Sequence, residues 1–326
     1  MDLSRRRWRL VFRGVVPVSS GPSAYISHPA CAMHNMGKGH PECAERLEAI
    51  KDRLMAAGIW DFLLHMDAPA ATREQLARVH GMAYLDRLAM ISPTHGFVHA
   101  DPDTAMNPFT LRAAYHAAGA GIAAVDAVMQ GKAANAFCGV RPPGHHAEKN
   151  NAMGFCFFNN VAVAARHAIE QYGLERVVIV DFDVHHGNGT EDIFCEDPRV
   201  MMVSFFQHPF FPYSGDVPRG ANMRNFPMPR GTTGAQFRDL VIEQWLPVLN
   251  EFAPQFVFIS AGFDAHLEDE MSTMGLVEAD YAWVTKQLMQ IADQYAGGRI
   301  VSFLEGGYDL SALGRSVAAH IKALSD

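Results

Sequence analysis

Short apolar runs alternate with longer stretches of helical character along this chain. The apolar runs, which we predict to be buried strands, cover residues 136–140, 176–182, 200–206, 255–260 and 299–304. The predicted helices cover residues 42–57, 110–129, 159–172, 236–252, 281–295 and 311–324. Strands separated by helices of this length predict an α/β fold, namely a single-domain, three-layer α/β/α arrangement with a mostly parallel central sheet.

The pattern indicates one domain with an N-terminal extension. No internal repeat, low-complexity tract or linker divides the 326 residues. We expect residues 24–326 to form the domain and residues 1–23 to be a disordered extension. The arginines and short apolar stretch of this extension faintly resemble a signal peptide, but Arg13 interrupts the stretch and no convincing cleavage site follows. A translation start assigned too far upstream would also explain it.

Ionisable side chains follow four of the predicted strands. In chain order they are His145 with His146, Asp183 with His185, Asp264, and Tyr308. In open parallel α/β sheets the ligand site lies outside the carboxyl ends of the strands. We therefore expect these side chains to meet at one edge of the sheet.

The segment that follows residues 176–180 has the composition of a metal site. If the strand continues through it, Asp181, Asp183 and His185 point the same way. Asp183 and His185 suit a shared ion, and Asp264 is the natural third ligand, although a helix cap would also explain a lone aspartate there. A satisfied polar strand end is the simpler explanation, but burying so many ionisable groups without a function is costly. The pattern therefore favours a metal-assisted hydrolase.

His145 or His146, or both with divided roles, would transfer protons beside this ion. Asp181 and Asn188 could each accept a hydrogen bond from one of the two rings. A charged partner raises a histidine pKa more than a neutral one, so we expect the histidine on Asp181 to stay cationic and the histidine on Asn188 to act as base. Tyr308 could donate to a tetrahedral oxyanion, with an ordinary half-buried tyrosine as the alternative.

Composition and charge exclude several other classes of protein. The chain is 49% hydrophobic and 19% charged, as in ordinary globular proteins. Its net charge of −8 gives no sign of direct nucleic-acid binding, and no apolar run reaches the length of a membrane span. The five cysteines form no Cys-x-x-Cys pair, which favours reduced thiols and a cytoplasmic location over a cysteine-based zinc site.

Several motifs, in this order along the chain, resemble the zinc-dependent histone deacetylase family. They cover residues 141–146, 154–160, 181–189, 260–264 and 305–308, within a match that runs from about His40 to the C-terminus. The resemblance implies the arginase-deacetylase fold. It also implies a zinc-dependent amidohydrolase that removes acetyl or other acyl groups from lysine side chains by attack of a metal-activated water.

The resemblance assigns roles to individual residues. It implies that one zinc ion is bound by Asp183, His185 and Asp264. It makes His145 and His146 the acid–base pair and gives Tyr308 the task of polarising the acyl carbonyl. Asn188 and the Leu304–Tyr308 loop resemble the class II branch and its bacterial relatives, whereas Ala44 stands where a proline is common.

The family also implies a substrate tunnel and a second ion. The tunnel would be lined by Gly154, Phe155 and Phe211. A structural potassium ion would be held by the carboxylate of Asp181, the hydroxyl of Ser204 and the backbone oxygens of Asp183, His185 and Phe205.

The substrate branch depends on the segment after Asp264. A polyamine-selective relative has an acidic residue at the position that Met271 occupies here. Glu268 and Glu270 are close enough for a one-residue shift to restore a carboxylate. We expect acyl-lysine in proteins to be the substrate, with small acetylated polyamines as the alternative.

Two other functions compete with this interpretation. An arginase-like ureohydrolase would need two adjacent metals and more bridging carboxylates, and we interpret His266, after Asp264, as a coincidental echo of such a motif. A non-catalytic relative that binds metal or acyl-lysine is expected to lose the histidine pair or Tyr308, and all three residues are present.

The identity of the metal ion has alternatives too. Iron(II) or cobalt(II) would also suit two carboxylates and one imidazole.

Overall fold

Eight strands form a central sheet in the order β2-β1-β5-β10-β9-β6-β7-β8, and every neighbouring pair in it is parallel. The computed structural model describes residues 21–326. The strands are β1 (Ala24–Ser27), β2 (Leu64–Asp67), β5 (Ala136–Cys138), β6 (Val177–Asp181), β7 (Val200–Gln207), β8 (Met223–Met228), β9 (Phe256–Ala261) and β10 (Ile300–Leu304). A separate antiparallel hairpin is formed by β3 (Val98–Asp101) and β4 (Thr104–Met106).

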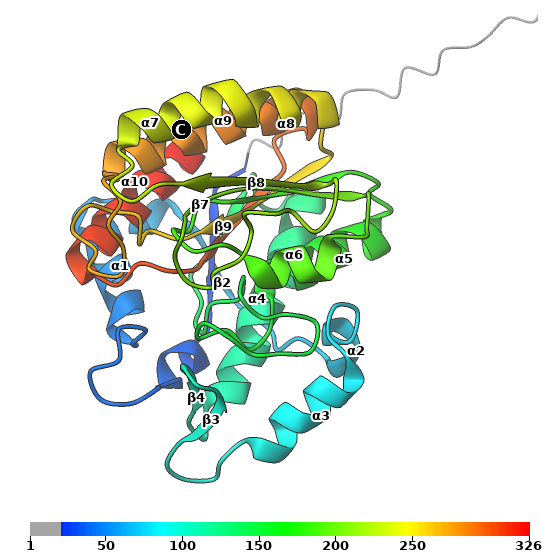
Figure 1. Ribbon diagram of the computed structural model, residues 1–326, viewed down its shortest axis with the longest axis vertical. Helices are drawn as coiled ribbons and strands as arrows, with labels where there is room; N and C mark the ends of the chain where they lie inside the picture. The colour runs from blue at the N-terminus through cyan, green and yellow to red at the C-terminus, as the bar shows by residue number, and fades with distance from the viewer. Residues whose placement is uncertain (1–20) are drawn as a thin grey trace, which may run out of the picture.

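Helices cover both faces of the sheet (Figure 1). They are α1 (Glu45–Ala56), α2 (Arg73–Leu76), α3 (Met82–Ile91), α4 (Thr110–Met129), α5 (Asn160–Tyr172), α6 (Asn188–Phe194), α7 (Gly234–Leu240), α8 (Leu246–Phe252), α9 (Glu278–Tyr295) and α10 (Leu310–Ser325). Shorter 3-10 turns are η1 (Pro29–Met33) and η2 (Trp60–Phe62), and a π turn, η3 (Val241–Trp245), joins α7 to α8.

Two apolar cores lie on the two faces of the sheet. Val177 and Ile179 of β6 pack into the core that contains α4 and α5. Val178 and Val180 of the same strand pack into the core that contains α1, α9 and α10. The alternation follows from the period of two of a β-strand, and burial on both faces explains why these strands are continuous apolar runs.

The predicted fold class is confirmed. The helix predicted at residues 110–129 has those bounds, and the one at 159–172 begins one residue later because Asn159 caps it. The stretch predicted as one helix over 236–252 begins at Gly234 and contains the π turn. The sequence pattern did not predict β2, the hairpin β3–β4, α3, α6 or β8; β8 is a half-exposed edge strand that contains Pro227 and lacks an apolar run.

The remaining expectations concern the domain boundary, the cysteines and membrane spans. Residues 1–20 of the predicted extension lie outside the described residues, whereas its last part contacts the fold: the Ser23 carbonyl accepts from the amide of Leu64 at 2.9 Å. All five cysteines lie within the described residues and are free thiols. Between residues 21 and 326, no helix combines the length and the apolar character needed to cross a bilayer.

Candidate active site

Loops that follow β5, β6, β9 and β10 meet at the carboxyl edge of the sheet. They bring together the polar residues that the sequence placed after those strands: His145, His146, Asp183, His185, Asp264 and Tyr308. The first five of these side chains are buried, with Tyr308 half-buried. The predicted convergence at one edge is therefore observed.

The turn after β6 is held by its own carboxylates. The strand ends at Asp181, so Asp183 and His185 do not belong to its alternation, contrary to our expectation. Asp181 Oδ1 accepts the amide of Asp183 at 3.0 Å, and Asp183 Oδ1 accepts the amide of His185 at 2.8 Å. Side-chain acceptors commonly stabilise turns in this way. The turn separates Asp181, which contacts His145, from the other two residues.

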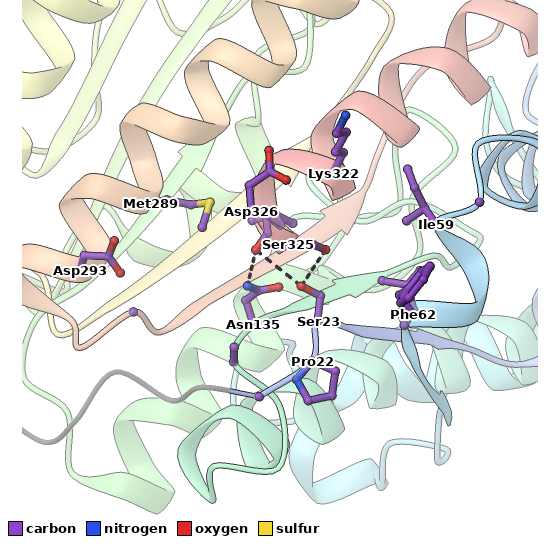
Figure 2. A pocket seen from close by; sticks show the side chains of 16 residues that line it. Pro22, Ser23, Ile59, Phe62, Asn135, Met289, Asp293, Lys322, Ser325 and Asp326 are labelled. Carbon is purple, nitrogen blue, oxygen red and sulfur yellow. Dashed lines mark hydrogen bonds between the residues drawn. The ribbon is translucent and has the colours of Figure 1, made fainter.

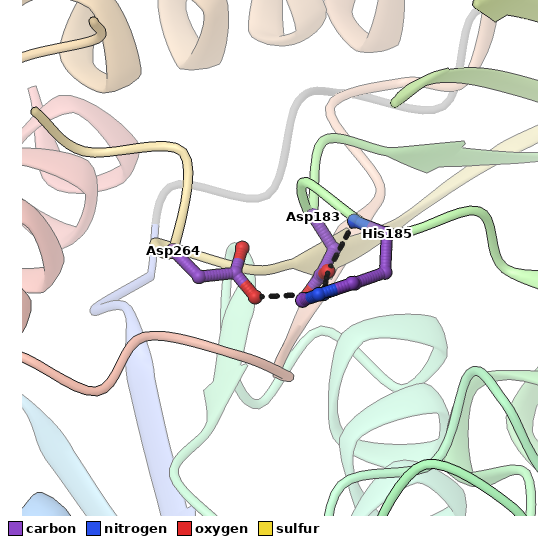
Figure 3. A group of neighbouring side chains, drawn as sticks. All are labelled: Asp183, His185 and Asp264. Carbon is purple, nitrogen blue, oxygen red and sulfur yellow. Dashed lines mark hydrogen bonds and ion pairs between the residues drawn. The ribbon is translucent and has the colours of Figure 1, made fainter. Parts of the chain in front are cut away.

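Asp183, His185 and Asp264 form a compact buried group (Figure 3). One ligand atom from each lies within 4.8 Å of the others. His185 Nδ1 lies 3.0 Å from Asp183 Oδ1 and 3.2 Å from Asp264 Oδ2. The remaining carboxylate oxygens accept backbone amides: Asp183 Oδ2 from Gly306 at 2.8 Å and Asp264 Oδ1 from Val184 at 2.9 Å. With these oxygens bound to the backbone, Asp183 Oδ1 and Asp264 Oδ2 are the carboxylate oxygens that face the His185 ring.

The group has the properties of a divalent-metal site. Asp264 Oδ2 is buried and accepts no hydrogen bond from the described residues. Burial and the nearby charge of Asp183 raise the pKa of Asp264 to about 7, because two carboxylates crowded together resist ionising together. A dication between them removes that repulsion and gives the free oxygen a partner. Two carboxylates and one imidazole therefore fit zinc, with room for a further ligand.

His145 and His146 each have the kind of partner that the sequence offered. His145 Nδ1 lies 2.9 Å from Asp181 Oδ2, and His146 Nδ1 lies 2.7 Å from Asn188 Oδ1. Asn188 Nδ2 donates to Glu148 Oε1 at 3.0 Å, which fixes the amide so that its oxygen faces His146. The ring nitrogen of His146 that faces Asn188 is therefore the donor, and its other nitrogen is left to accept a proton.

The two partners separate the pKa values of the pair. Burial alone would lower the pKa of His145, but the carboxylates of Asp183 and Asp181 outweigh it and hold that pKa well above the usual range. Burial, together with the neighbouring imidazoles of His145 and His185, holds the pKa of His146 well below the usual range. A dication bound to Asp183 would oppose this increase in the pKa of His145. These surroundings give His145 a higher pKa than His146, in the order that we expected from their partners.

A narrow pocket leads to the buried group of Asp183, His185 and Asp264. Its volume is about 240 Å³, and it is lined by Asp103, His146, Gly154, Phe155, His185, Phe210, Phe211, Met271 and Tyr308. Phe211 lies edge-on to His146, with ring centroids 5.3 Å apart. Gly154 has a φ of +53°, and a Cβ there would lie 2.4 Å from His146 Cδ2, so glycine permits the close approach. The pocket contains every predicted substrate-contacting residue.

The hairpin β3–β4 supports one side of this pocket and was not predicted. Asp103 Oδ1 accepts the amide of Gly154 at 3.1 Å, and Thr104 Oγ1 accepts the amide of Phe155 at 3.0 Å. Phe155 has a φ of +70°, an unfavourable conformation for a residue other than glycine. Backbone anchoring by the hairpin helps to hold it.

Arg46 lies beneath the Tyr308 loop. Its Nε donates to the Gly307 carbonyl at 2.7 Å, and Nη2 donates to the Glu305 carbonyl at 2.5 Å. The guanidinium carbon lies 5.1 Å from the centroid of the Tyr308 ring. Arg46 is fully buried and also pairs with Glu42 at 3.2 Å. Arg46 therefore holds the backbone of the Tyr308 loop from the interior of the protein.

Three of the five residues expected to hold a monovalent cation lie side by side in the sheet, whereas Asp183 and His185 belong to the turn after β6. Asp181 of β6 pairs in register with Ser204 of β7, and Phe205 follows it. Ser204 Oγ lies 3.4 Å from the Phe205 carbonyl oxygen. Asp181 and Ser204 are fully buried.

A second, larger pocket lies far from this chemistry. It has a volume of about 560 Å³ and is lined by residues around the start of β1 and the end of α10 (Figure 2). Ser23, Asn135 and Ser325 hydrogen-bond one another or the Leu324 carbonyl there. This pocket lies at the amino ends of the strands, whereas the metal-ligating group found among the described residues lies at their carboxyl ends. Size alone therefore does not identify the active site.

Known proteins match nearly the whole chain. Residues 40–324 match the histone deacetylase domain. The chain is 37% identical over 317 residues to histone deacetylase 14, chloroplastic, of Arabidopsis thaliana, covering 90% of this chain and 75% of that protein. It is 38% identical over 306 residues to the polyamine deacetylase HDAC10 of Mus musculus, covering 87% of this chain and 44% of that protein. The crystal structure of the HDA15 HD domain is similar with a TM-score of 0.88 and 34% identity, covering 93% of this chain and 88% of that one.

Proposed function

Because this chain belongs to the histone deacetylase family, we propose that it is a zinc-dependent amidohydrolase that removes acetyl or other acyl groups from lysine side chains. The observation that carries the proposal is the buried group of Asp183, His185 and Asp264 at the end of a pocket that also contains His146 and Tyr308. We assign this activity to a catalytic domain of residues 24–326.

Zinc would be held by His185 and by the carboxylates of Asp183 and Asp264, and it would give the unpartnered Asp264 Oδ2 a ligand partner. When bound, it would polarise an amide carbonyl and make a water molecule a stronger nucleophile at neutral pH. The hydrogen bonds from the amides of Gly306 and Val184 keep the two carboxylates in place before the ion arrives.

His146 serves as the base in this proposal. Its low pKa keeps it neutral near pH 7, and Asn188 fixes the proton on Nδ1, so Nε2 is free to accept a proton. His145 shares its proton with Asp181 and stabilises negative charge that develops beside it. The division of roles follows from one charged and one neutral partner.

Tyr308 donates a hydrogen bond from its phenol to the acyl oxygen. Burial, first, and the charge of Asp264 raise the pKa of Tyr308 well above its usual range, so the phenol keeps its proton. Such a donor stabilises the oxyanion of a tetrahedral intermediate. Gly154, Phe155 and Phe211 provide a close and largely apolar passage for the methylenes of the substrate side chain.

A structural potassium ion is the second proposed cofactor. Asp181 and the hydroxyl of Ser204 would bind it, with the backbone oxygens of Asp183, His185 and Phe205. The support is the register that places Asp181 beside Ser204, together with the full burial of both side chains. The ion would offset part of the charge of Asp181.

We propose acyl-lysine in proteins as the substrate, ahead of acetylated polyamines. Met271 lines the pocket next to Tyr308, so an apolar side chain occupies the place where a carboxylate would favour a polycation. Glu268 instead pairs with Arg315 at 2.7 Å, and Glu270 is exposed outside the set of residues that lines this pocket. The five free thiols suit a reducing compartment such as the cytoplasm.

Hydrolysis by zinc-loaded and chelator-stripped protein is the decisive test. Acetyl-lysine peptides, longer acyl-lysine peptides and acetylated polyamines would be compared at equal concentration. We expect zinc-dependent release of acetate, highest with an acyl-lysine peptide. Replacement His146→Ala should abolish turnover while zinc remains bound, and His95→Ala, an exposed histidine outside the pocket, should leave it intact.

Two results would redirect the proposal. Full activity of His146→Ala would refute the acid–base assignment. Zinc binding without turnover of any of these substrates would favour a non-catalytic relative that binds metal or acyl-lysine.

A further inference from the structure

Asp269 places its carboxylate between two loops of the active site. It belongs to the loop after Asp264 and is 4% exposed. Oδ1 accepts the amide of Met271 at 2.9 Å. Oδ2 accepts the amides of Tyr308 at 2.6 Å and Asp309 at 3.1 Å. The two oxygens thus divide their bonds between the two loops.

The loop that carries Tyr308 needs such an anchor. Gly306 and Gly307 precede the tyrosine, and Gly307 has a φ of +119°, a conformation that residues with a side chain rarely adopt. Arg46 binds carbonyl oxygens of this loop at Glu305 and Gly307. Asp269 accepts backbone amides of the same loop, at Tyr308 and Asp309. The carbonyl groups and the amide groups of the loop are therefore both bound by buried charged side chains.

We propose that Asp269 is a positioning residue for Tyr308: its carboxylate ties the Tyr308 loop to the Met271 segment and so fixes the phenol at the metal-ligating end of the pocket. The inference rests on the proposed function, in which the phenol touches the acyl oxygen. Met271 and Tyr308 both line the pocket, so one carboxylate sets the spacing of two neighbouring parts of its lining.

An asparagine cannot replace this carboxylate. All three partners of Asp269 are N–H donors, and they approach both oxygens. In Asp269→Asn, one oxygen becomes an NH₂ group. This NH₂ group would face a backbone N–H, and two donors cannot form a hydrogen bond with each other. The amide either loses the Met271 contact or loses the contacts to Tyr308 and Asp309. In both cases the connection between the loops is broken.

Amide hydrogen exchange tests the connection without relying on catalysis. The zinc-loaded wild type would be compared with Asp269→Asn and with Asp280→Asn as matched control. Asp280 is also 4% exposed and accepts a backbone amide, from Val277 at 2.9 Å, in the cap of α9 away from the pocket. We expect faster exchange in the peptide that contains Tyr308 or in the one that contains Met271 for Asp269→Asn, and in neither for Asp280→Asn.

Kinetics test whether the connection acts through the phenol. Asp269→Asn should lower kcat by about 10- to 100-fold, with KM and zinc content nearly unchanged, because a misplaced donor mainly loses transition-state contacts. In the Tyr308→Phe background the same change should cost less than about twofold, since the group being positioned is gone. Asp280→Asn should leave kcat unchanged in both backgrounds.

The outcomes separate this inference from the proposed function. Equal losses in both backgrounds, or unchanged exchange in both peptides, would refute the positioning role. A wild type that hydrolyses no acylated amine would refute the function, while exchange would still report on the connection. If Asp269→Asn fails to fold, Asp269→Glu is the substitute, because it keeps the charge but lengthens the side chain. Its loss of kcat should likewise be larger with Tyr308 present than in the Tyr308→Phe background. An equal loss in the two backgrounds would refute the positioning role.

Discussion

Replacement of Asn188 by aspartate should move the acidic limb of the pH profile. Asn188 Oδ1 lies 2.7 Å from His146 Nδ1, so Asn188→Asp exchanges a neutral acceptor for a charged one at hydrogen-bond distance. A carboxylate this close stabilises the imidazolium and raises a histidine pKa by about 1 to 3. A pKa change of about 1 corresponds to about 1.4 kcal/mol. The substitution therefore opposes the burial that keeps His146 neutral.

The direction of the effect follows from the proposed role of His146 as a base. A higher pKa leaves less of the neutral imidazole at a given low pH, so kcat/KM falls there and recovers above the new pKa. The acidic limb should therefore move to higher pH by at least about 1, and kcat/KM below the limb should fall about tenfold for each such step. The assay is kcat/KM for an acetyl-lysine peptide across the acidic and neutral pH range, with zinc content checked at each end.

A second substitution, Glu148→Gln, isolates the effect of the new charge at position 188. Asn188 Nδ2 donates to Glu148 Oε1 at 3.0 Å, so Asn188→Asp alone brings two carboxylates together. In the double variant with Glu148→Gln, the new amide can donate to the new carboxylate and the local contact is kept. Glu148→Gln alone should leave the limb in place. An unmoved limb in the double variant would refute the assignment of His146 as the titrating base.

Three further substitutions test other parts of the structure. Thr104→Val removes the acceptor of the Phe155 amide, and the loss of about 1 kcal/mol should raise KM about fivefold; an unchanged KM would contradict the support role of the hairpin. Met271→Glu should raise kcat/KM for an acetylated polyamine over an acetyl-lysine peptide about tenfold by charge attraction, and an equal gain with Met271→Gln would refute that cause. Arg141→Met leaves Glu42 buried without its closest cation, so stability should fall by about 3–5 kcal/mol in thermal or denaturant unfolding; an unchanged midpoint would contradict it.

The sequence predicted the sheet and the candidate metal group of Asp183, His185 and Asp264 because both depend on residue identity. Buried parallel strands are continuous apolar runs, and β6 and β9 were found from them. Asp183 and Asp264 were found because they follow those strands, and strand ends share one edge of the sheet. The edge strand β8 and the hairpin β3–β4 lack that signal, since polar residues or Pro227 interrupt their apolar positions.

The residues that hold the site in shape left no comparable signal. Asp103 accepts the amide of a residue 51 positions away, and Asp269 accepts amides 39 and 40 positions away. A backbone N–H is the same group in almost every residue, so the donor side of such a bond has no signature in the sequence. Only the acceptor is visible, and an isolated aspartate in a loop is indistinguishable from a solvated one. Motifs therefore identify the groups that perform the chemistry, whereas the groups that fix their positions emerge only when the loops are seen together.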